Sequence, residues 1–198
     1  GASHTGGSAL RWSCLARGAY RTPLGTVEVD EPLVDALRAR CPWLEPDPWG
    51  QRGEHAIEVV LPFLQRAQRE GISIVPILTT TERLEECTAL GEALAECLVG
   101  QEGLLVASSD LSHYETVVSG AAKDRHLIET MCRLDVHGLL RTVQEEAVVM
   151  CGAGAVASVL TASARLGATR GELAGYGTSV AAGGDPYSVT GYAGILLR

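Results

Sequence analysis

The sequence predicts an α/β protein, a layered α/β/α fold around a mixed, partly parallel central sheet. Two observations support this class. Amphipathic helical patterns alternate with short aliphatic runs along the 198 residues, and several of these runs are apolar throughout, as in strands buried on both faces. Aromatic residues make up only 5% while glycine numbers 23, which indicates an aliphatic core and many turns.

The first part of the chain is predicted to contain two strands and three helices. In order, these are a strand at 10–15 and a helix at 31–40, then a helix at 54–70, a strand at 72–78 and a helix at 82–99. Pro23 and Gly25 predict a turn between the first two elements. Asp30 is typical of a helix N-cap, and Pro32 falls in the first turn, where its missing N–H costs little. Pro62 is expected to kink the helix at 54–70.

The second part is predicted to begin and end with a strand. The expected elements are a strand at 104–107, helices at 119–134, 135–146 and 154–166, and a closing strand at 189–197. Asp135 is placed to cap the second of these helices, and Gly167 to end the third. The sequence contains neither an internal repeat nor a linker, so residues 1–198 are predicted to form a single domain.

Charge and composition exclude several classes of function. The net charge is −8, from 24 acidic and 16 basic residues, which argues against binding to nucleic acid or to an anionic membrane surface. No apolar run approaches the roughly 20 residues of a membrane helix, and the first residues lack the pattern of a signal peptide. Six cysteines occur without a CxxC pair, which predicts mostly buried, reduced thiols in a cytoplasmic protein.

Reactive side chains stand beside turn residues in four separate segments. The candidates in them are His4, His55, the pair Asp110 and His113, and Cys151. Taken alone, each is more typical of a solvated histidine or of a small buried thiol. Together, imidazole nitrogens and a thiolate form a ligand set suited to Cu, Fe or Zn, and three protein ligands would leave a coordination position open.

Neighbouring acids add to this hypothesis. Glu58 follows His55 by three residues and is predicted to accept the second ring N–H of that histidine from the same helical face. Asp110 and His113 are predicted to form a proton-transfer pair after the strand at 104–107. His126 and His137 are interpreted as solvated.

One glycine motif points elsewhere. Residues 152–157 read G-x-G-x-x-A before a helix, and Glu172 lies twenty residues after Gly152, which mimics a dinucleotide-binding motif. The apolar run before it is short, however, and Glu172 precedes the next apolar stretch, whereas the ribose-binding acid should end a strand. We therefore do not expect a nicotinamide or flavin dinucleotide here.

With these residues in view, the chain resembles the MEMO family, whose bacterial and archaeal members are often called AmmeMemoRadiSam system protein B. The matching segments, in order, are GASHT at 1–5, AYRTPLGTVEVD at 19–30, EHAIEVVLPFLQ at 54–65, ISIVPIL at 72–78, SSDLSHY at 108–114, CGAGAV at 151–156, LGA at 166–168, YGTS at 176–179 and VTGYAGILL at 189–197. The resemblance implies a fold like that of the class III (LigB-type) extradiol dioxygenases.

The resemblance also implies a site. Its metal ligands would be His4, His55 and Cys151, holding one transition-metal ion, with Fe(II) or Cu ahead of Zn. His113 would line the same pocket as an acid/base or substrate contact, supported by Asp110. The dioxygenases have a carboxylate where this chain has Cys151, and a thiolate is softer and redox-active, so ring cleavage does not transfer automatically.

Three functions are compatible with the resemblance. The leading expectation is a redox-active, metal-binding protein. The alternatives are a non-catalytic module that binds a partner or peptide on a vestigial dioxygenase fold, and an extradiol-type dioxygenase with a small aromatic substrate. An AMMECR-type protein and a radical-SAM enzyme are the partners that the family's name implies. Members normally carry an N-terminal segment ahead of the GxSH motif, so residues 1–198 are expected to be a MEMO-like domain without it.

Overall fold

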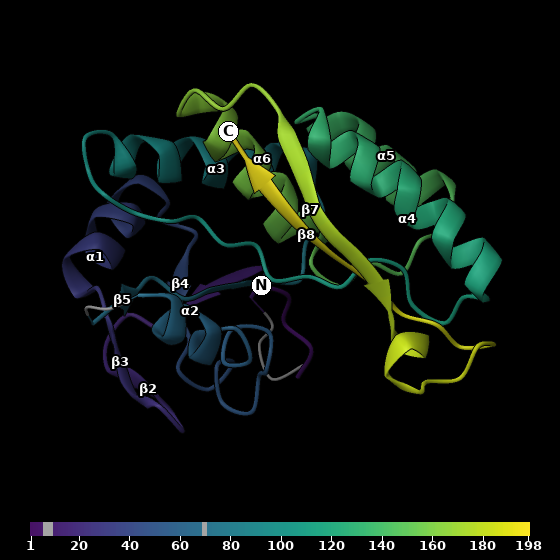
Figure 1. Cartoon of the computed structure of the whole chain (residues 1–198). Helices are drawn as coiled ribbons and strands as arrows, with labels where there is room; N and C mark the ends of the chain where they lie inside the picture. Colours follow the sequence, from purple (N-terminus) through teal and green to yellow (C-terminus); the bar gives the residue numbers. More distant parts are fainter. Residues whose placement is uncertain (6–9, 69–70) are drawn as a thin grey trace. The chain divides into compact units, whose positions relative to one another are not determined.

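The computed structural model describes residues 1–5, 10–68 and 71–198 (Figure 1). The chain divides into two compact units, Gly1–Thr81 and Glu82–Arg198. Both units combine helices and strands, and the sheets contain parallel and antiparallel pairs, which confirms the predicted α/β class. The single-domain organisation stays a prediction. Within the described ranges, no helix has both the length and the apolar character needed to cross a bilayer.

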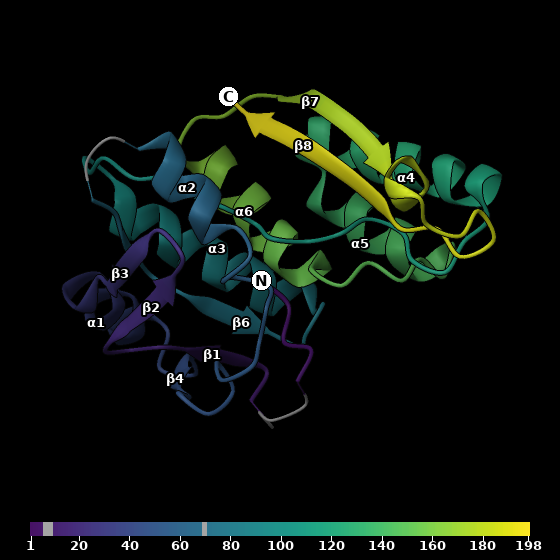
Figure 2. The ribbon, with the colours of Figure 1, turned by 60° about the horizontal axis from the view of Figure 1, so that its bottom comes forward.

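The first unit contains two small sheets. One has the order β4–β1–β6, formed by Glu45–Pro46, Trp12–Cys14 and Ile77–Thr79. In it, β1 runs parallel to β4 and antiparallel to β6. The other has the order β2–β3–β5, formed by Ala19–Thr22, Gly25–Val29 and Ser73–Ile74. Figure 2 shows β2 and β3 side by side, joined by the turn that Pro23 and Gly25 predict.

Helix α1 (Glu31–Arg40) forms as predicted, because its N-terminus is capped by a side chain. The Asp30 carboxylate accepts a hydrogen bond of 3.0 Å from the backbone N–H of Leu33. Pro32 lies in the first turn, where no N–H is needed. Val34 and Leu37 are buried on the inner face of the helix.

The helix predicted at 54–70 is wrong over its first part. Helix α2 begins at Leu61 and ends at Ala67, residues 56–60 form turns, and residues 69–70 lie outside the described residues. Pro62 is thus a first-turn residue instead of the cause of a kink, since proline disrupts a helix interior but fits its start. Likewise, the strand predicted at 72–78 is divided into β5 and β6 around Pro76.

The second unit contains four α-helices and a two-stranded antiparallel sheet. The helices are α3 (Leu84–Leu98), α4 (Val117–Cys132), α5 (Val136–Glu145) and α6 (Ala153–Arg165). The strands are β7 (Gly171–Thr178) and β8 (Gly191–Leu197), which contact α4 and run beside each other in Figure 2. Asp135 caps α5 as predicted, with a hydrogen bond of 2.7 Å from Gly138 N–H. Strand β7 was not predicted, because its glycines interrupt the apolar pattern.

Helices α3 and α6 pack closely around a glycine. A Cβ at Gly91 would lie 2.5 Å from Cβ of Thr161 and 2.6 Å from the carbonyl oxygen of Ser158. Leu90 and Leu160 are almost fully buried on the two helices. The aliphatic core of this unit therefore depends on backbone contact as well as on large side chains.

The strand predicted at 104–107 is not formed. These residues pair with no other strand in the part of the chain that the structure describes, and Leu104 is 73% exposed. A short apolar run becomes a strand only when another backbone segment supplies hydrogen bonds, and a local pattern carries no information about that partner.

Candidate functional site

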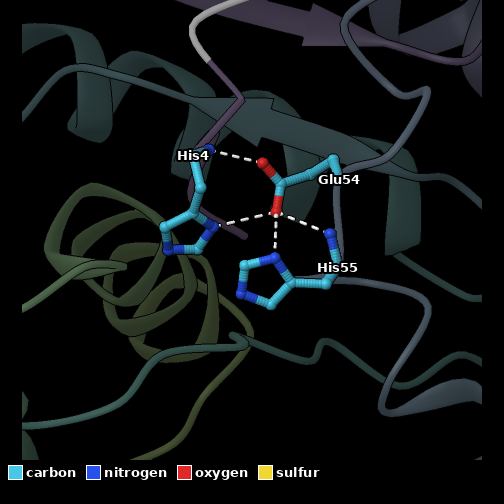
Figure 3. Close-up of side chains that lie close together, drawn as sticks. All are labelled: His4, Glu54 and His55. Carbon is cyan, nitrogen blue, oxygen red and sulfur yellow. Dashed lines mark hydrogen bonds and ion pairs between the residues drawn. The ribbon is translucent and has the colours of Figure 1, made fainter.

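The first unit brings His4 and His55 together around one buried carboxylate (Figure 3). Oε1 of Glu54 lies 2.8 Å from Nδ1 of His4 and 3.5 Å from Nδ1 of His55. The two rings stack, with centroids 4.5 Å apart and planes inclined by 22°. The Glu54 side chain is 2% exposed, whereas His4 is 34% and His55 59% exposed. The buried Glu54 carboxylate therefore contacts the inner side of two imidazole rings that are accessible to solvent.

Backbone groups fix the position of the Glu54 carboxylate. Oε1 accepts hydrogen bonds from the N–H groups of His55 and Ala56, at 2.8 Å and 2.9 Å. Oε2 accepts one from the N–H of His4. Burial raises the pKa of the Glu54 carboxyl, but the hydrogen bonds from the His4 ring and from the backbone outweigh burial and lower the pKa to about 2. Glu54 is therefore an ionised acceptor at neutral pH.

This carboxylate selects the tautomer of His4. Because an ionised carboxylate only accepts hydrogen bonds, Nδ1 of His4 is the donor, and Nε2 of the neutral ring carries the free lone pair. Nδ1 of His55 faces the same carboxylate oxygen. Figure 3 shows the Nε2 atoms of both rings turned to one side, away from Glu54.

Non-local backbone contacts hold the segment that carries His4. Ala2 forms a parallel bridge with Thr79 at the end of β6, and the N–H of Ser3 donates to the Thr79 carbonyl at 2.9 Å. His4 follows directly. His55 comes just before the turn at 56–60 that precedes α2, next to Glu54 in the chain.

The acid beside Nδ1 of His55 is Glu54, whereas Glu58 was predicted for this role. Residues 54–60 lie ahead of the first residue of α2. Glu54 was missed because the prediction relied on helical spacing. Its position directly before a candidate histidine is the only signal the sequence offers.

The second unit brings Asp110, His113 and Cys151 together. One potential ligand atom from each of the three residues lies within 4.8 Å of the others. Nε2 of His113 is 3.2 Å from Oδ2 of Asp110, and the N–H of Asp110 donates to Sγ of Cys151 at 3.3 Å. The predicted pairing of Asp110 with His113 is thus present, with a thiol at its edge.

A backbone carbonyl orients the His113 ring. Nδ1 lies 2.8 Å from the carbonyl oxygen of Val149. Because a carbonyl only accepts, Nδ1 is the donor and Nε2 is left to face Asp110. The contact between Nε2 and Oδ2 is a hydrogen bond when a proton lies on either atom, which is the arrangement of a proton-transfer pair. Tyr114, the next residue, has a φ of +60°, an uncommon backbone conformation for a residue other than glycine.

Cys151 is placed by the turn that begins α6. A Cβ at Gly152 would lie 2.5 Å from Cβ of Ser109 and 2.6 Å from the carbonyl oxygen of Ser108, so the turn can approach that segment only with glycine. The hydroxyl of Ser109 accepts from the N–H of Gly152 at 2.9 Å and donates to the Asp110 carbonyl at 2.6 Å. This close approach explains Gly152 without a dinucleotide ligand.

Thus His4 is brought to His55 within the first unit, and Asp110 and His113 are brought to Cys151 within the second. His126 and His137 are exposed, as predicted, and His126 contacts Glu146 at 2.7 Å. Besides Glu54, the sequence analysis missed the Val149 carbonyl, which accepts from the His113 ring. A backbone carbonyl is present at every residue, so the sequence gives no signal for it.

Comparisons with known proteins identify the class of this chain. A profile of the Memo-like protein family matches residues 1–196. The chain is 38% identical over 201 residues to a MEMO1 family protein of Methanopyrus kandleri, covering 100% of this chain and 70% of that protein. It is 35% identical over 181 residues to one of Nitrosopumilus maritimus, covering 91% and 66%. A third, from Aquifex aeolicus, is 34% identical over 198 residues, covering 100% and 73%.

The chain belongs to the Memo-like protein family. This conclusion rests on the match over nearly its full length, and it confirms the resemblance given by the sequence segments. The relatives' names state the family and no activity.

Proposed function

We propose that the protein binds one transition-metal ion, Fe(II) or Cu, through His4, His55 and Cys151, and that it is redox-active. The observation that carries the proposal is the orientation of the two imidazoles. One ionised carboxylate engages the Nδ1 side of His4 and His55, and the Nε2 atoms face one side. A carboxylate behind a histidine is the usual outer partner of a metal-binding imidazole, because it fixes the tautomer and raises ligand basicity.

The donor set fits such an ion. Imidazole nitrogen suits Fe, Cu and Zn, and sulfur favours soft or borderline metals over Mg or Ca. Glu54, whose oxygens are occupied by four hydrogen bonds, is better suited to orient the histidines than to act as a ligand. When bound, Fe or Cu would supply a Lewis acid and a one-electron redox couple.

The chain's own acid/base group in this proposal is His113. The Val149 carbonyl holds the Nδ1 proton, so proton exchange with a substrate takes place at Nε2, and Asp110 stabilises the protonated ring. The Asp110 side chain is 42% exposed, so the pair is accessible to a ligand or to water.

Metal analysis of anaerobically purified protein tests the ligand set. We expect about one metal ion per chain in the wild type and its loss in His4→Ala, His55→Ala and Cys151→Ser. His137→Ala and Cys132→Ser are matched controls, because they remove the same chemical groups outside both clusters and should keep the metal. Unchanged metal content in all three ligand variants would refute the proposal.

Redox activity is tested separately on the loaded protein. A reversible one-electron wave in voltammetry of the loaded wild type that is absent from the metal-free protein supports it. Bound metal without such a wave, together with binding of a partner that persists in His113→Ala, would instead favour the non-catalytic module.

A further inference from the structure

Helix α4 carries a buried carboxylate that the proposed chemistry does not use. Asp124 is 1% exposed. Its Oδ1 accepts a hydrogen bond of 2.9 Å from the backbone N–H of Ser112, and its Oδ2 accepts one of 2.8 Å from the hydroxyl of Tyr176 in β7. Ser112 is the residue immediately before His113, so this carboxylate is connected to the second cluster through one backbone bond.

The surroundings of Asp124 leave it little freedom. A Cβ at Gly191, the first residue of β8, would lie 1.9 Å from Oδ2 of Asp124. Gly191 also pairs with the loop through its backbone: its carbonyl accepts from the N–H of Leu111 and its N–H donates to the carbonyl of Ser112, both at 2.9 Å. The backbone just ahead of His113 is therefore held by β8 and by a side chain of α4.

Burying a carboxylate costs more free energy than filling the same space with an apolar side chain. Removing an ionised group from water costs several kcal/mol, and an apolar residue of similar size often stabilises a fold at least as well. Asp124 receives only two neutral donors among its described contacts. An apolar residue at 124 could fill the volume but could not accept the Ser112 N–H. What the carboxylate adds is the fixed position of that N–H.

We propose that Asp124 is a positioning residue, which fixes the Ser112 backbone and thereby holds the His113 ring between the Val149 carbonyl and the Asp110 carboxylate. The ring needs this restraint because its Nδ1 proton must stay at 2.8 Å from Val149 for Nε2 to face Asp110. A displacement of about 1 Å would break that hydrogen bond. The functional meaning rests on the proposed acid/base role of His113, whereas the geometric effect does not.

The test uses the full chain without metal and a signal from the His113 ring itself. The Nδ1–H of His113 should exchange slowly enough to be seen in a ¹H–¹⁵N spectrum, and His113→Gln assigns it by its loss. Asp124→Ala removes the acceptor. Asp124→Asn keeps an oxygen for the Ser112 N–H. Tyr176→Phe is the matched control, because it removes the other partner of the same carboxylate and leaves the Ser112 bond in place.

We expect the ring N–H signal in the wild type, in Asp124→Asn and in Tyr176→Phe, and at least a tenfold faster exchange or complete loss in Asp124→Ala. The inference is overturned if Asp124→Ala is folded and keeps the signal, or if Tyr176→Phe loses it equally. Should Asp124→Ala not fold, the other two variants decide: a retained signal in both supports the inference, and loss in either overturns it. Metal content is measured independently, so a failure of the proposed metal site would not be mistaken for a failure of this inference.

Discussion

Replacing Glu54 provides the sharpest test of the histidine pair. Glu54→Ala removes the acceptor of three backbone N–H groups and of the His4 ring. If the N–H groups stay buried, each costs about 1–3 kcal/mol, so the free energy of unfolding should fall by about 3 kcal/mol at the low end. Loss of an outer partner of a metal-bound histidine costs about 10- to 100-fold in metal affinity, equivalent to about 1.4–2.8 kcal/mol.

Chelator competition measures the affinity, and urea titration measures the stability of the metal-free protein. Glu54→Gln should be intermediate, because one oxygen stays an acceptor while the new amide NH₂ meets the N–H of His4. Glu58→Ala is the matched control: it removes the exposed acid that helical spacing would have chosen. Equal losses of affinity in Glu54→Ala and Glu58→Ala, or an unchanged affinity in the former, would show that the orientation argument is incorrect.

Three further predictions concern the framework around the clusters. Gly152→Ala should lower the free energy of unfolding by about 1–3 kcal/mol in urea titration, because its Cβ would overlap Ser109; an unchanged midpoint would contradict the close approach. Asp30→Ala should cost about 1 kcal/mol through the lost helix cap, and Asp30→Ser should recover most of it. Burial, the hydrogen bond to Asp124 and the charge of that carboxylate raise the pKa of Tyr176 from 10.0 to about 12. Since the folded pKa is the higher one, this contribution to stability is complete below pH 10 and is lost as pH rises towards 12. Tyr176→Phe should weaken that alkaline loss of stability, which denaturation curves at pH 9 and 11 would show.

The sequence predicted best where structure is decided locally. Asp30 and Asp135 were recognised as helix caps, and both make the expected hydrogen bond. Pro62 shows the limit of the same reasoning. Pro32 and Pro62 both lie in a first helical turn, but the apolar spacing at 57, 61 and 64 predicts too early a start for the second helix.

The site was predictable in its residues but only partly in its geometry. His4, His55, Asp110, His113 and Cys151 were all singled out, and the structure gathers them into one cluster in each unit. Which acid lies behind the histidines depends on a contact between residues 50 positions apart, from His4 to Glu54. Such pairings are set by the fold and leave no periodic trace in the sequence.

Gly91 limits how α3 and α6 can slide along each other. Because no Cβ fits between α3 and the Ser158 carbonyl of α6, sliding by one turn would bring Cys87 or Ala95 to the same place, and both carry a Cβ. The two helices can pack in the observed register or move apart, but they cannot shift by one turn and stay packed. We therefore expect α3 and α6 to keep this register in any rearrangement that leaves the pair packed.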